Sequence, residues 1–259
     1  MFTPTPVAVD QPDLKGLLIA LAIVGTWICN LAWFLSAHLP TLSASVLVAA
    51  VLLQTFLNTG LFVTAHDAIH GSVYPADSNI NRWVGELCAI AYACLPYQTL
   101  ATNHKLHHRD PTSTDDPDFN PRHNVSFLAC YVRFIRQYWG WRQFLQLTGL
   151  LVIMAWIFQL SPANLAVFWG IPSFLSSLQL FYFGTYRPHQ SFDRAKLNDM
   201  GCNSTSDGVR PHEGCCAKSD PWPWLLSLLT CYHFGYHQEH HDRPDTPWWG
   251  LPQVYRENR

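Results

Sequence analysis

Two long stretches of this 259-residue chain contain no Asp, Glu, Lys or Arg. They run from Leu17 to Ala65 and from Gln143 to Tyr186, and they are 49 and 44 residues long. A helix needs about 20 apolar residues to cross a bilayer, so each stretch is long enough for two crossings. In a soluble protein such segments would expose large apolar patches. The sequence therefore predicts an all-α integral membrane protein with about four transmembrane helices.

The four crossings are expected as two pairs, each joined by a short polar turn. We place them at Leu17–Ala37, Ala44–Ala65, Phe144–Leu160 and Ala163–Thr185. A shorter apolar stretch, Trp83–Leu100, contains Glu86 and Pro96, which is typical of a re-entrant or interfacial hairpin. Trp222–Tyr232 is too short to cross. Residues 1–16 lack the pattern of a signal peptide, so we expect the first crossing to remain in the protein as an anchor. We expect residues 1–259 to form a single membrane domain.

The positive charges predict the orientation in the membrane. The turns near Pro40 and Pro162 contain no Lys or Arg, and all 16 basic residues lie in the segments on the other side of the expected crossings. Basic residues favour the cytoplasmic side. Every histidine except His38 lies on that side too. We therefore expect a multi-pass protein of the inner, plasma or thylakoid membrane, with a histidine-rich cytoplasmic cap that includes a polar loop at 190–220.

The overall charge and the cysteines limit the possible partners and sites. The net charge is −2 and no basic stripe stands out, which argues against nucleic acid as a partner. The eight cysteines form no CxxC pair, and free thiols in a reducing compartment are the favoured interpretation. Cys202, Cys215 and Cys216 lie near His212 and could bind zinc, but their spacing fits no common zinc site.

Three histidine clusters follow apolar segments on the predicted cytoplasmic side. They are His66 and His70 (HxxxH), then His104, His107 and His108 (HxxHH), and then His237, His240 and His241 (HxxHH). On a helix, residues three and four apart are neighbours on one face, so each cluster can supply ligands to two adjacent metals. A lone histidine is usually a surface residue. Two HxxHH clusters and an HxxxH pair on one side of the membrane predict a metal centre.

The ligand types predict which metals bind. Imidazole suits Fe, Zn, Cu and Ni, and there is no thiolate cluster for a soft metal. Eight imidazoles are too many for one zinc ion. Soluble di-iron bundles use Glu-x-x-His pairs, and none of the four Glu residues begins such a pair. The count of imidazoles fits two metals, and redox chemistry on an apolar substrate favours two iron ions.

Further residues are candidates near this centre. His189 follows the last crossing and is a candidate ninth ligand, and His233 lies four residues before His237 and could bind or support a metal. Asp67, Asp116 and Asp118 could accept hydrogen bonds from ligand imidazoles. The alternative is a solvated carboxylate at a helix end for the first and an Asp- and Pro-rich turn for the other two. We expect His38, His123 and His212 to be surface residues.

Aromatic residues gather near the expected ends of the crossings. They include Trp83, Tyr138, Trp139, Trp141, Trp248 and Trp249. A belt at the membrane interface is the favoured interpretation. The alternative is that some of them line a groove for a long apolar substrate.

Several motifs resemble a known family. They are Thr64–Gly71, Asp116–Asp118, Gln179–Thr185, Thr230–His241 and Pro247–Pro252. The histidine clusters resemble those of the membrane fatty-acid desaturase and hydroxylase superfamily. The stretches Tyr-His-Phe-Gly-Tyr and Pro-Trp-Trp resemble the bacterial and cyanobacterial β-carotene ketolases within it. The resemblance covers nearly the whole chain after about Leu17 and is weakest in loop 190–220.

This resemblance implies a reaction. The enzyme would use a di-iron site, O₂ and an external electron donor such as ferredoxin, with β-carotene or another β-ring carotenoid as substrate. Carbon C4 of the ring is allylic, so loss of its hydrogen leaves a radical delocalised into the polyene. Two successive hydroxylations at C4 would give a geminal diol, which loses water to form the ketone of echinenone or canthaxanthin. The protein would position C4 and exclude water.

Other functions remain open on the sequence alone. A carotenoid 3-hydroxylase or a fatty-acyl desaturase of the same superfamily is the nearest alternative. A histidine-rich membrane metal transporter belongs to another class, but its sites would lie near the bilayer midplane and not at the ends of the crossings. A zinc-dependent membrane hydrolase is disfavoured because the sequence shows no nucleophile motif.

Overall fold

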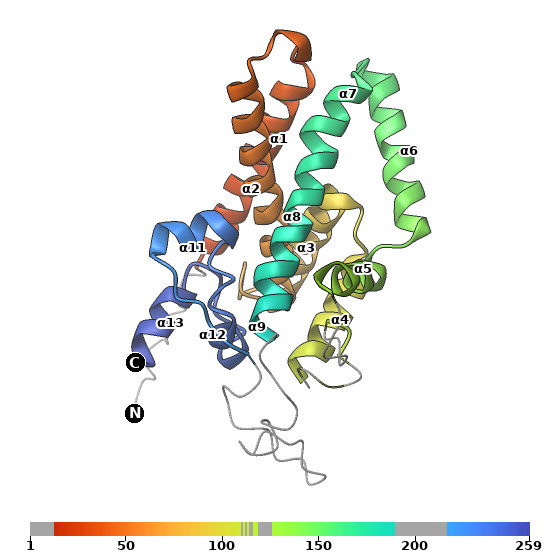
Figure 1. The fold of residues 1–259 in the computed structure, drawn as a ribbon. Helices are drawn as coiled ribbons and strands as arrows, with labels where there is room; N and C mark the ends of the chain where they lie inside the picture. Colours follow the sequence, from red (N-terminus) through yellow and green to blue (C-terminus); the bar gives the residue numbers. More distant parts are fainter. Residues whose placement is uncertain (1–12, 110, 112, 114–115, 119–125, 190–216) are drawn as a thin grey trace, which may run out of the picture.

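The two uncharged stretches fold into long helices, which form the end of the molecule opposite the chain termini (Figure 1). The computed structural model describes residues 13–109, 111, 113, 116–118, 126–189 and 217–259. These residues contain helices and no strand, which confirms the all-α prediction. The predictions for His123, His212, Cys202, Cys215, Cys216 and most of loop 190–220 fall outside the described residues.

Among the described residues, four helices are long and apolar enough to cross a membrane, as predicted. They are α1 (Lys15–Leu35), α2 (Ala44–Ile69), α6 (Trp141–Phe158) and a run over Pro162–His189. That run joins α7 (Pro162–Leu165), α8 (Ile171–Phe181) and α9 (Arg187–His189) through π-helical turns at Ala166–Gly170 and Tyr182–Tyr186. Helix α2 and the last run continue past the predicted ends at Ala65 and Thr185. His66 and Asp67 in the last turn of α2, and His189 at the end of the last run, are buried inside the protein.

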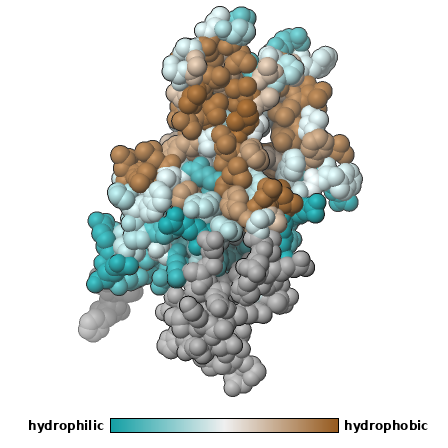
Figure 2. Space-filling model, viewed as in Figure 1, coloured by the Kyte–Doolittle hydropathy of each residue, from teal (hydrophilic) through white to brown (hydrophobic). Residues whose placement is uncertain are grey.

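The two ends of the molecule differ in polarity. The α1–α2 turn and the α6–α7 turn lie together at one end, and the C-terminal helices lie at the other (Figure 1). Apolar side chains dominate the outer surface of the crossing helices, and polar side chains gather over the opposite half (Figure 2). This arrangement agrees with a bundle in the bilayer and a cap outside it.

Helix α2 is the centre of the bundle, and it packs against α1, α8 and α3 (Ser78–Ala93). Its N-terminus is capped by Ser43, whose side chain accepts a hydrogen bond from the Val46 N–H. Polar side chains inside the bundle pair between helices: Thr59 Oγ1 lies 2.9 Å from Ser176 Oγ on α8. Such hydrogen bonds hold membrane helices together where lipid offers no partner.

The predicted hairpin is present as two helices. Helix α3 reaches Ala93, Cys94 adopts a left-handed conformation with φ 53°, and α4 (Tyr97–Arg109) returns toward the cap. Gly85 on α3 lies so close to Tyr97 that a Cβ atom there would come within 2.3 Å of the tyrosine ring. This close crossing lets α4 carry the second histidine cluster to the end of α2.

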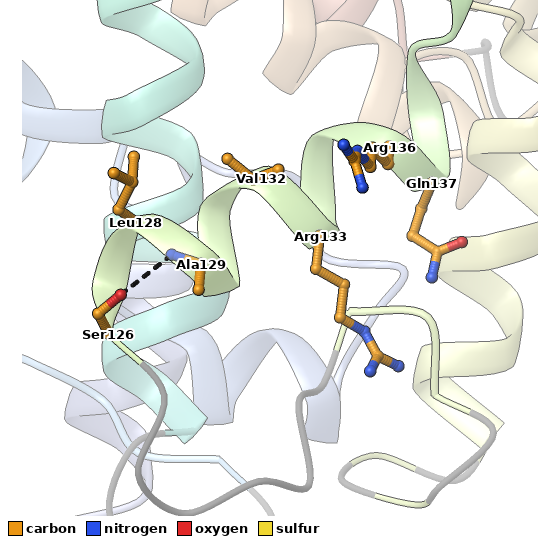
Figure 3. Close-up of a pocket in the computed structure, with 7 residues that line it drawn as sticks. All are labelled: Ser126, Leu128, Ala129, Val132, Arg133, Arg136 and Gln137. Carbon is orange, nitrogen blue, oxygen red and sulfur yellow. Dashed lines mark hydrogen bonds between the residues drawn. The ribbon is translucent and has the colours of Figure 1, made fainter.

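Two short helices present apolar side chains beside the bundle. On α5 (Phe127–Tyr138), a surface pocket combines Leu128 and Val132 with Arg133 and Arg136 (Figure 3). On α11 (Trp224–Cys231), large apolar side chains are exposed and form a patch in Figure 2; they are Trp224, Leu225, Leu226 and Leu229. On α5 the apolar side chains lie next to cationic ones, which is typical of helices that lie in a membrane interface.

The aromatic prediction is only partly correct. Trp83 and Trp141 are 65% and 69% exposed, as expected for an interfacial belt. Tyr138 is instead buried, because α5 turns it inward toward the histidines.

Helices α12 (His237–Asp242) and α13 (Leu251–Glu257) complete the cap.

Candidate metal centre

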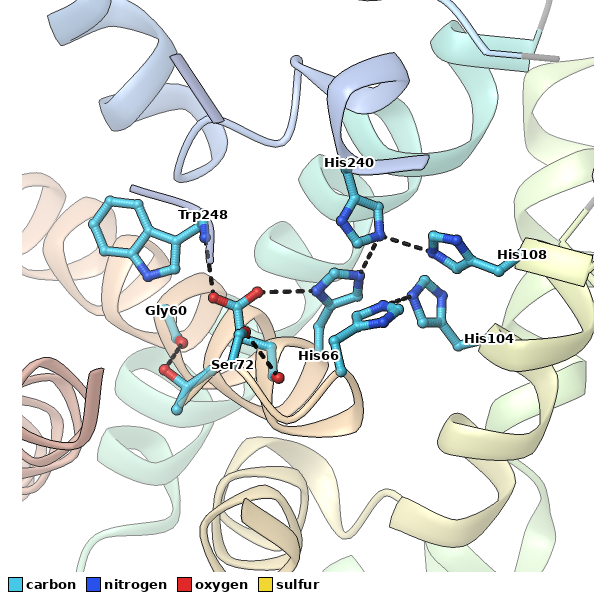
Figure 4. A network of polar contacts seen from close by, with 10 residues as sticks. Gly60, His66, Ser72, His104, His108, His240 and Trp248 are labelled. Atoms are coloured by element: carbon cyan, nitrogen blue, oxygen red, sulfur yellow. Dashed lines mark hydrogen bonds and ion pairs between the residues drawn. The ribbon is translucent and has the colours of Figure 1, made fainter. Parts of the chain in front are cut away.

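One group of five histidines lies where α2, α4 and α12 meet. It contains His66, His70, His104, His108 and His240, whose ligand atoms all lie within 4.8 Å of one another. The Nε2 atoms of His70 and His104 are 2.8 Å apart, as are those of His108 and His240. Figure 4 shows His66, His104, His108 and His240 pointing toward one another. Three segments far apart in the sequence thus converge on one point.

A second group of four histidines lies beside the first. It contains His107, His189, His237 and His241, again with all ligand atoms within 4.8 Å. Nε2 of His237 is 3.1 Å from Nε2 of His189 and 3.1 Å from Nε2 of His241. Nε2 of His107 is 3.1 Å from that of His241. His189 therefore lies with the predicted clusters, at the end of the fourth crossing.

Helical spacing explains how the clusters divide between the groups. The pairs His66/His70 and His104/His108 are separated by four residues, and both pairs join the first group. The pair His237/His241 has the same separation and joins the second group. The remaining member of each HxxHH cluster lies in the other group: His107 joins the second and His240 the first. Helices α4 and α12 thus both contribute to both groups.

The nitrogen–nitrogen distances fit ligands of a shared metal. Metal–imidazole bonds of ~2.1 Å at angles of 90–110° separate neighbouring ligand nitrogens by about 3.0–3.4 Å. The six closest Nε2–Nε2 distances in the two groups range from 2.8 to 3.2 Å, and all ligand atoms of a group lie within 4.8 Å of one another. Two groups with this geometry can hold two metal ions. Among the described residues, both groups consist of imidazoles alone.

Asp67 orients His66 in the first group. Nδ1 of His66 lies 3.2 Å from Oδ1 of Asp67, and the other carboxylate oxygen accepts the Trp248 backbone N–H at 3.0 Å. The network is visible in Figure 4. A proton on Nδ1 leaves the lone pair on Nε2, which faces the group. Asp67 is 4% exposed, so the alternative of a solvated carboxylate is wrong.

Asp116 has the same relation to His107 in the second group. Nδ1 of His107 lies 2.9 Å from Oδ2 of Asp116, and the Asp118 backbone N–H donates to Oδ1 of Asp116 at 2.9 Å. The Asp118 carboxylate accepts a hydrogen bond from the Tyr138 hydroxyl and makes no ligand contact in the described hydrogen bonds. Asp118 therefore acts one step further from the centre than the sequence suggested.

Burial controls the protonation of the imidazoles outside the crossing helices. It lowers the pKa of His70 to about 4 and that of His108 to about 2. Burial and then the neighbouring imidazoles place four further pKa values well below the ordinary range, those of His104, His237, His240 and His241. Burial also acts on His107, but Asp116 outweighs it and raises that pKa. The neutral imidazoles are in the form that binds a metal.

The other predicted residues lie elsewhere. His233 is buried but belongs to neither group: its Nδ1 lies 3.0 Å from Ser227 Oγ, and its ring packs against Trp224 and Trp248. Its backbone has φ 62°, which turns the side chain away from the direction that a continued helix would give. His38 is exposed in the α1–α2 turn, as expected.

Three contacts at the centre had no signal in the sequence. The Phe234 ring packs edge-on against His66, with 4.8 Å between ring centroids. Ser219 donates to the Glu239 carboxylate and accepts the Gln238 backbone N–H, which ties α12 to the segment before α11. Tyr138 reaches Asp118 from α5. Each contact joins residues that are distant in the sequence, so only the fold reveals it.

A small cavity lies against both groups. It has a volume of about 40 Å³ and is lined by His66, His104, His107 and His237, among others. Since a water molecule needs roughly 10–15 Å³ of such space, the cavity has room for a few molecules of that size. The cavity therefore places a small space next to imidazoles of both groups.

Comparison with known proteins agrees with this architecture. The family model described as fatty acid desaturase matches residues 41–145 and 130–259. The chain is 37% identical over 253 residues to a protein named β-carotene ketolase from one strain of Paracoccus, covering 95% of this chain and 96% of that protein. A second Paracoccus strain has a protein of the same name that is 36% identical, with coverage of 93% and 92%. A β-carotene ketolase of Haematococcus lacustris is 33% identical, with coverage of 94% and 80%. The chain therefore belongs to the fatty acid desaturase family, and within it is similar to the proteins named β-carotene ketolases.

Proposed function

We propose that this protein is a carotenoid 4-ketolase that converts β-carotene to echinenone and canthaxanthin at a pair of iron ions. The observation that carries the proposal is the convergence of two imidazole groups, one of five residues and one of four, in a chain whose relatives named β-carotene ketolases match it over nearly its full length. The 3-hydroxylase, the acyl desaturase and the metal transporter are not favoured by these relatives.

The residues present fit two iron ions. Two sets of imidazole nitrogens, whose nearest pairs are 2.8 and 3.1 Å apart, suit a pair of metals with several ligands each. His66 and His107 have their ring orientations fixed by Asp67 and Asp116, a type of support common behind metal-bound imidazoles. When bound, the iron pair would activate O₂ with electrons from an external donor such as ferredoxin and so supply the oxidant.

The protein itself positions ring C4 of the carotenoid and excludes water from the site. The histidines are held by helices α2, α4, α9 and α12, so the site is built on packed elements and not on loops. Two successive oxygenations of ring C4 each consume one O₂, two electrons and two protons and release one water. The resulting geminal diol loses a further water to give the ketone. A closed site that keeps C4 aligned for the second oxygenation favours the ketone over the alcohol.

Product analysis tests the reaction. Expression in cells that make β-carotene should give echinenone and canthaxanthin, and the purified protein should contain close to two irons per chain. Products hydroxylated at C3 would support the alternative hydroxylase, and unchanged β-carotene with altered acyl chains would support a desaturase. Full activity with one metal per chain, or with zinc, would refute the iron pair.

We also propose that the centre faces the cytoplasm. This rests on the absence of Lys and Arg from the turns near Pro40 and Pro162. In a cysteine-depleted protein, single cysteines at the exposed positions Ser43 and Ser161 should react with an impermeant thiol reagent from outside, and one at Asp245 in the cap should not. Labelling of Asp245→Cys from outside would reverse the proposed orientation.

A further inference from the structure

A second, larger cavity opens among the crossing helices. Its volume is about 460 Å³, and it lies between α3, α5, α6 and α8. Its lining is almost wholly apolar. It includes the aromatic rings of Tyr131, Trp169 and Phe174 and the aliphatic side chains of Leu147 and Leu151. The cavity occupies the side of the bundle where α6 stands next to α8 and is joined to it through α7 (Figure 1). Helix α6 lines one side of the cavity, buries none of its residues and is apolar enough to cross a membrane, so we expect lipid around this side of the cavity.

The two cavities differ in what they can hold. Pockets for organic ligands commonly measure ~300–1,000 Å³, and the larger cavity falls in this range. The cavity of about 40 Å³ beside the histidines holds only a few water-sized molecules. A carotenoid ring therefore fits in the larger cavity, and it reaches the metal centre only if side chains between the two cavities move.

Four side chains line both cavities and separate them. They are Phe62 on α2, Phe134 and Tyr138 on α5, and Leu180 on α8. Tyr138 is held by its hydrogen bond to Asp118, and the helices that carry Phe62 and Leu180 pack closely against each other. Phe134 packs against the rings of Tyr138 and Phe181, at 5.0 Å and 5.2 Å between ring centroids, and its side chain has no polar atom. It can rotate without losing a hydrogen bond, and is the side chain best suited to open the passage.

We infer that the larger cavity receives the ring-bearing end of the carotenoid directly from the bilayer, and that Phe134 controls the passage of the ring to the metal centre. The inference rests on the proposed function and names the binding site for its substrate. An apolar cavity among the crossing helices suits a hydrocarbon that never leaves the membrane, and the aromatic lining suits a conjugated polyene. Only four side chains separate this cavity from the one beside the histidines, which favours a carotenoid substrate over a structural lipid.

Filling the cavity tests the binding site. Leu151→Trp places a large ring in the cavity, whereas Leu145→Trp places the same ring on the outer face of α6, where Leu145 is 56% exposed. We expect Leu151→Trp to weaken β-carotene binding in lipid nanodiscs, without reductant, by roughly tenfold or more, with iron content unchanged. Leu145→Trp should match the wild type. Leu147→Trp repeats the test one turn earlier if Leu151→Trp yields too little folded protein.

Narrowing the passage tests the second part. Phe134→Trp should keep β-carotene binding and iron content but lower the rate of ketone formation by about tenfold or more, so kcat falls while the binding constant holds. Equal β-carotene binding by Leu151→Trp and Leu145→Trp would overturn the binding site, and wild-type turnover by Phe134→Trp would overturn the passage. A wild-type protein that binds β-carotene but forms no ketone would instead refute the proposed function.

Discussion

Helices α2 and α6 are both apolar enough to cross a membrane, yet they have opposite places in the protein. In the most apolar 18-residue segment of α2, half of the residues are buried, whereas the corresponding segment of α6 has no buried residue. Helix α2 contacts α1, α3 and α8 and carries His66 in its last turn, while α6 lies at the edge of the bundle and forms one side of the larger cavity. Hydropathy thus identifies the helices that cross but does not tell which of them supports the site.

The difference lies in the polar residues within each helix. Helix α2 carries Asn58, Thr59 and Thr64, all buried, and Asn58 donates to Ser173 on α8 at 3.0 Å. On α6 the large side chains, such as Val152 and Trp156, are exposed to the surroundings. Substitutions on α2 should therefore affect the metal centre and the fold, and equivalent substitutions on α6 should not.

Loss of a histidine at the end of α2 should have the largest effect. His70→Ala removes an imidazole from the group of five, so ketone formation should be abolished and iron content reduced, while the protein still inserts in the membrane. The loss should exceed the roughly 10–100-fold typical of a supporting residue. His38→Ala, in the exposed α1–α2 turn, is the control and should be neutral. Ketone production by His70→Ala at the wild-type rate would contradict the assigned centre.

Removal of a supporting charge on α2 should have a smaller effect. Asp67→Asn weakens the acceptor for His66 Nδ1 but keeps an oxygen for the Trp248 N–H. We expect iron affinity, measured by titration with a chelator, to fall by about 10–100-fold. Glu257→Gln changes an exposed carboxylate and should leave iron affinity unchanged. Equal affinities in the two variants would show that Asp67 does not support a ligand.

Adding one methyl group to each helix should show the difference between α2 and α6 more directly. A Cβ atom at Gly60 on α2 would lie 2.5 Å from the Tyr232 hydroxyl oxygen, and that ring stacks on Phe56 at 4.4 Å between centroids. Gly60→Ala must displace Tyr232, so we expect a stability loss of about 1–3 kcal/mol, typical of overpacking. The measurement is the temperature at which half of the detergent-purified protein loses its fold. An unchanged midpoint would show that this packing is loose.

The same substitution on α6 should have the smallest effect. A Cβ atom at Gly149 meets nothing within 4 Å. Gly149→Ala should therefore leave ketone formation unchanged and alter stability by less than about 1 kcal/mol, toward higher stability, because alanine favours the helix. The same midpoint measurement compares it with Gly60→Ala. A destabilisation as large as that of Gly60→Ala would mean that α6 packs against a partner in the membrane.

Helix ends were predicted less accurately than helices. The crossings were placed correctly because a bilayer demands long uncharged segments. Helix α2 continues to Ile69, four residues past the predicted end of the crossing at Ala65, and its polar residues His66 and Asp67 are buried. Helix α5 was not foreseen, since its amphipathic pattern lies within a segment rich in basic residues.

The sequence by itself determined the four crossings, the gathering of the histidines at one end of them and the eight imidazoles of the three clusters, because hydropathy and helical spacing are local properties of the chain. His189 was within reach of the same reasoning because it follows a crossing. Only the tertiary structure decided that His107 and His240 lie in opposite groups from their neighbours, that His233 lies in neither, and that Tyr138 separates two cavities. These outcomes depend on the angles at which α4, α5 and α12 approach α2, and such angles follow from packing between residues that are distant in the sequence.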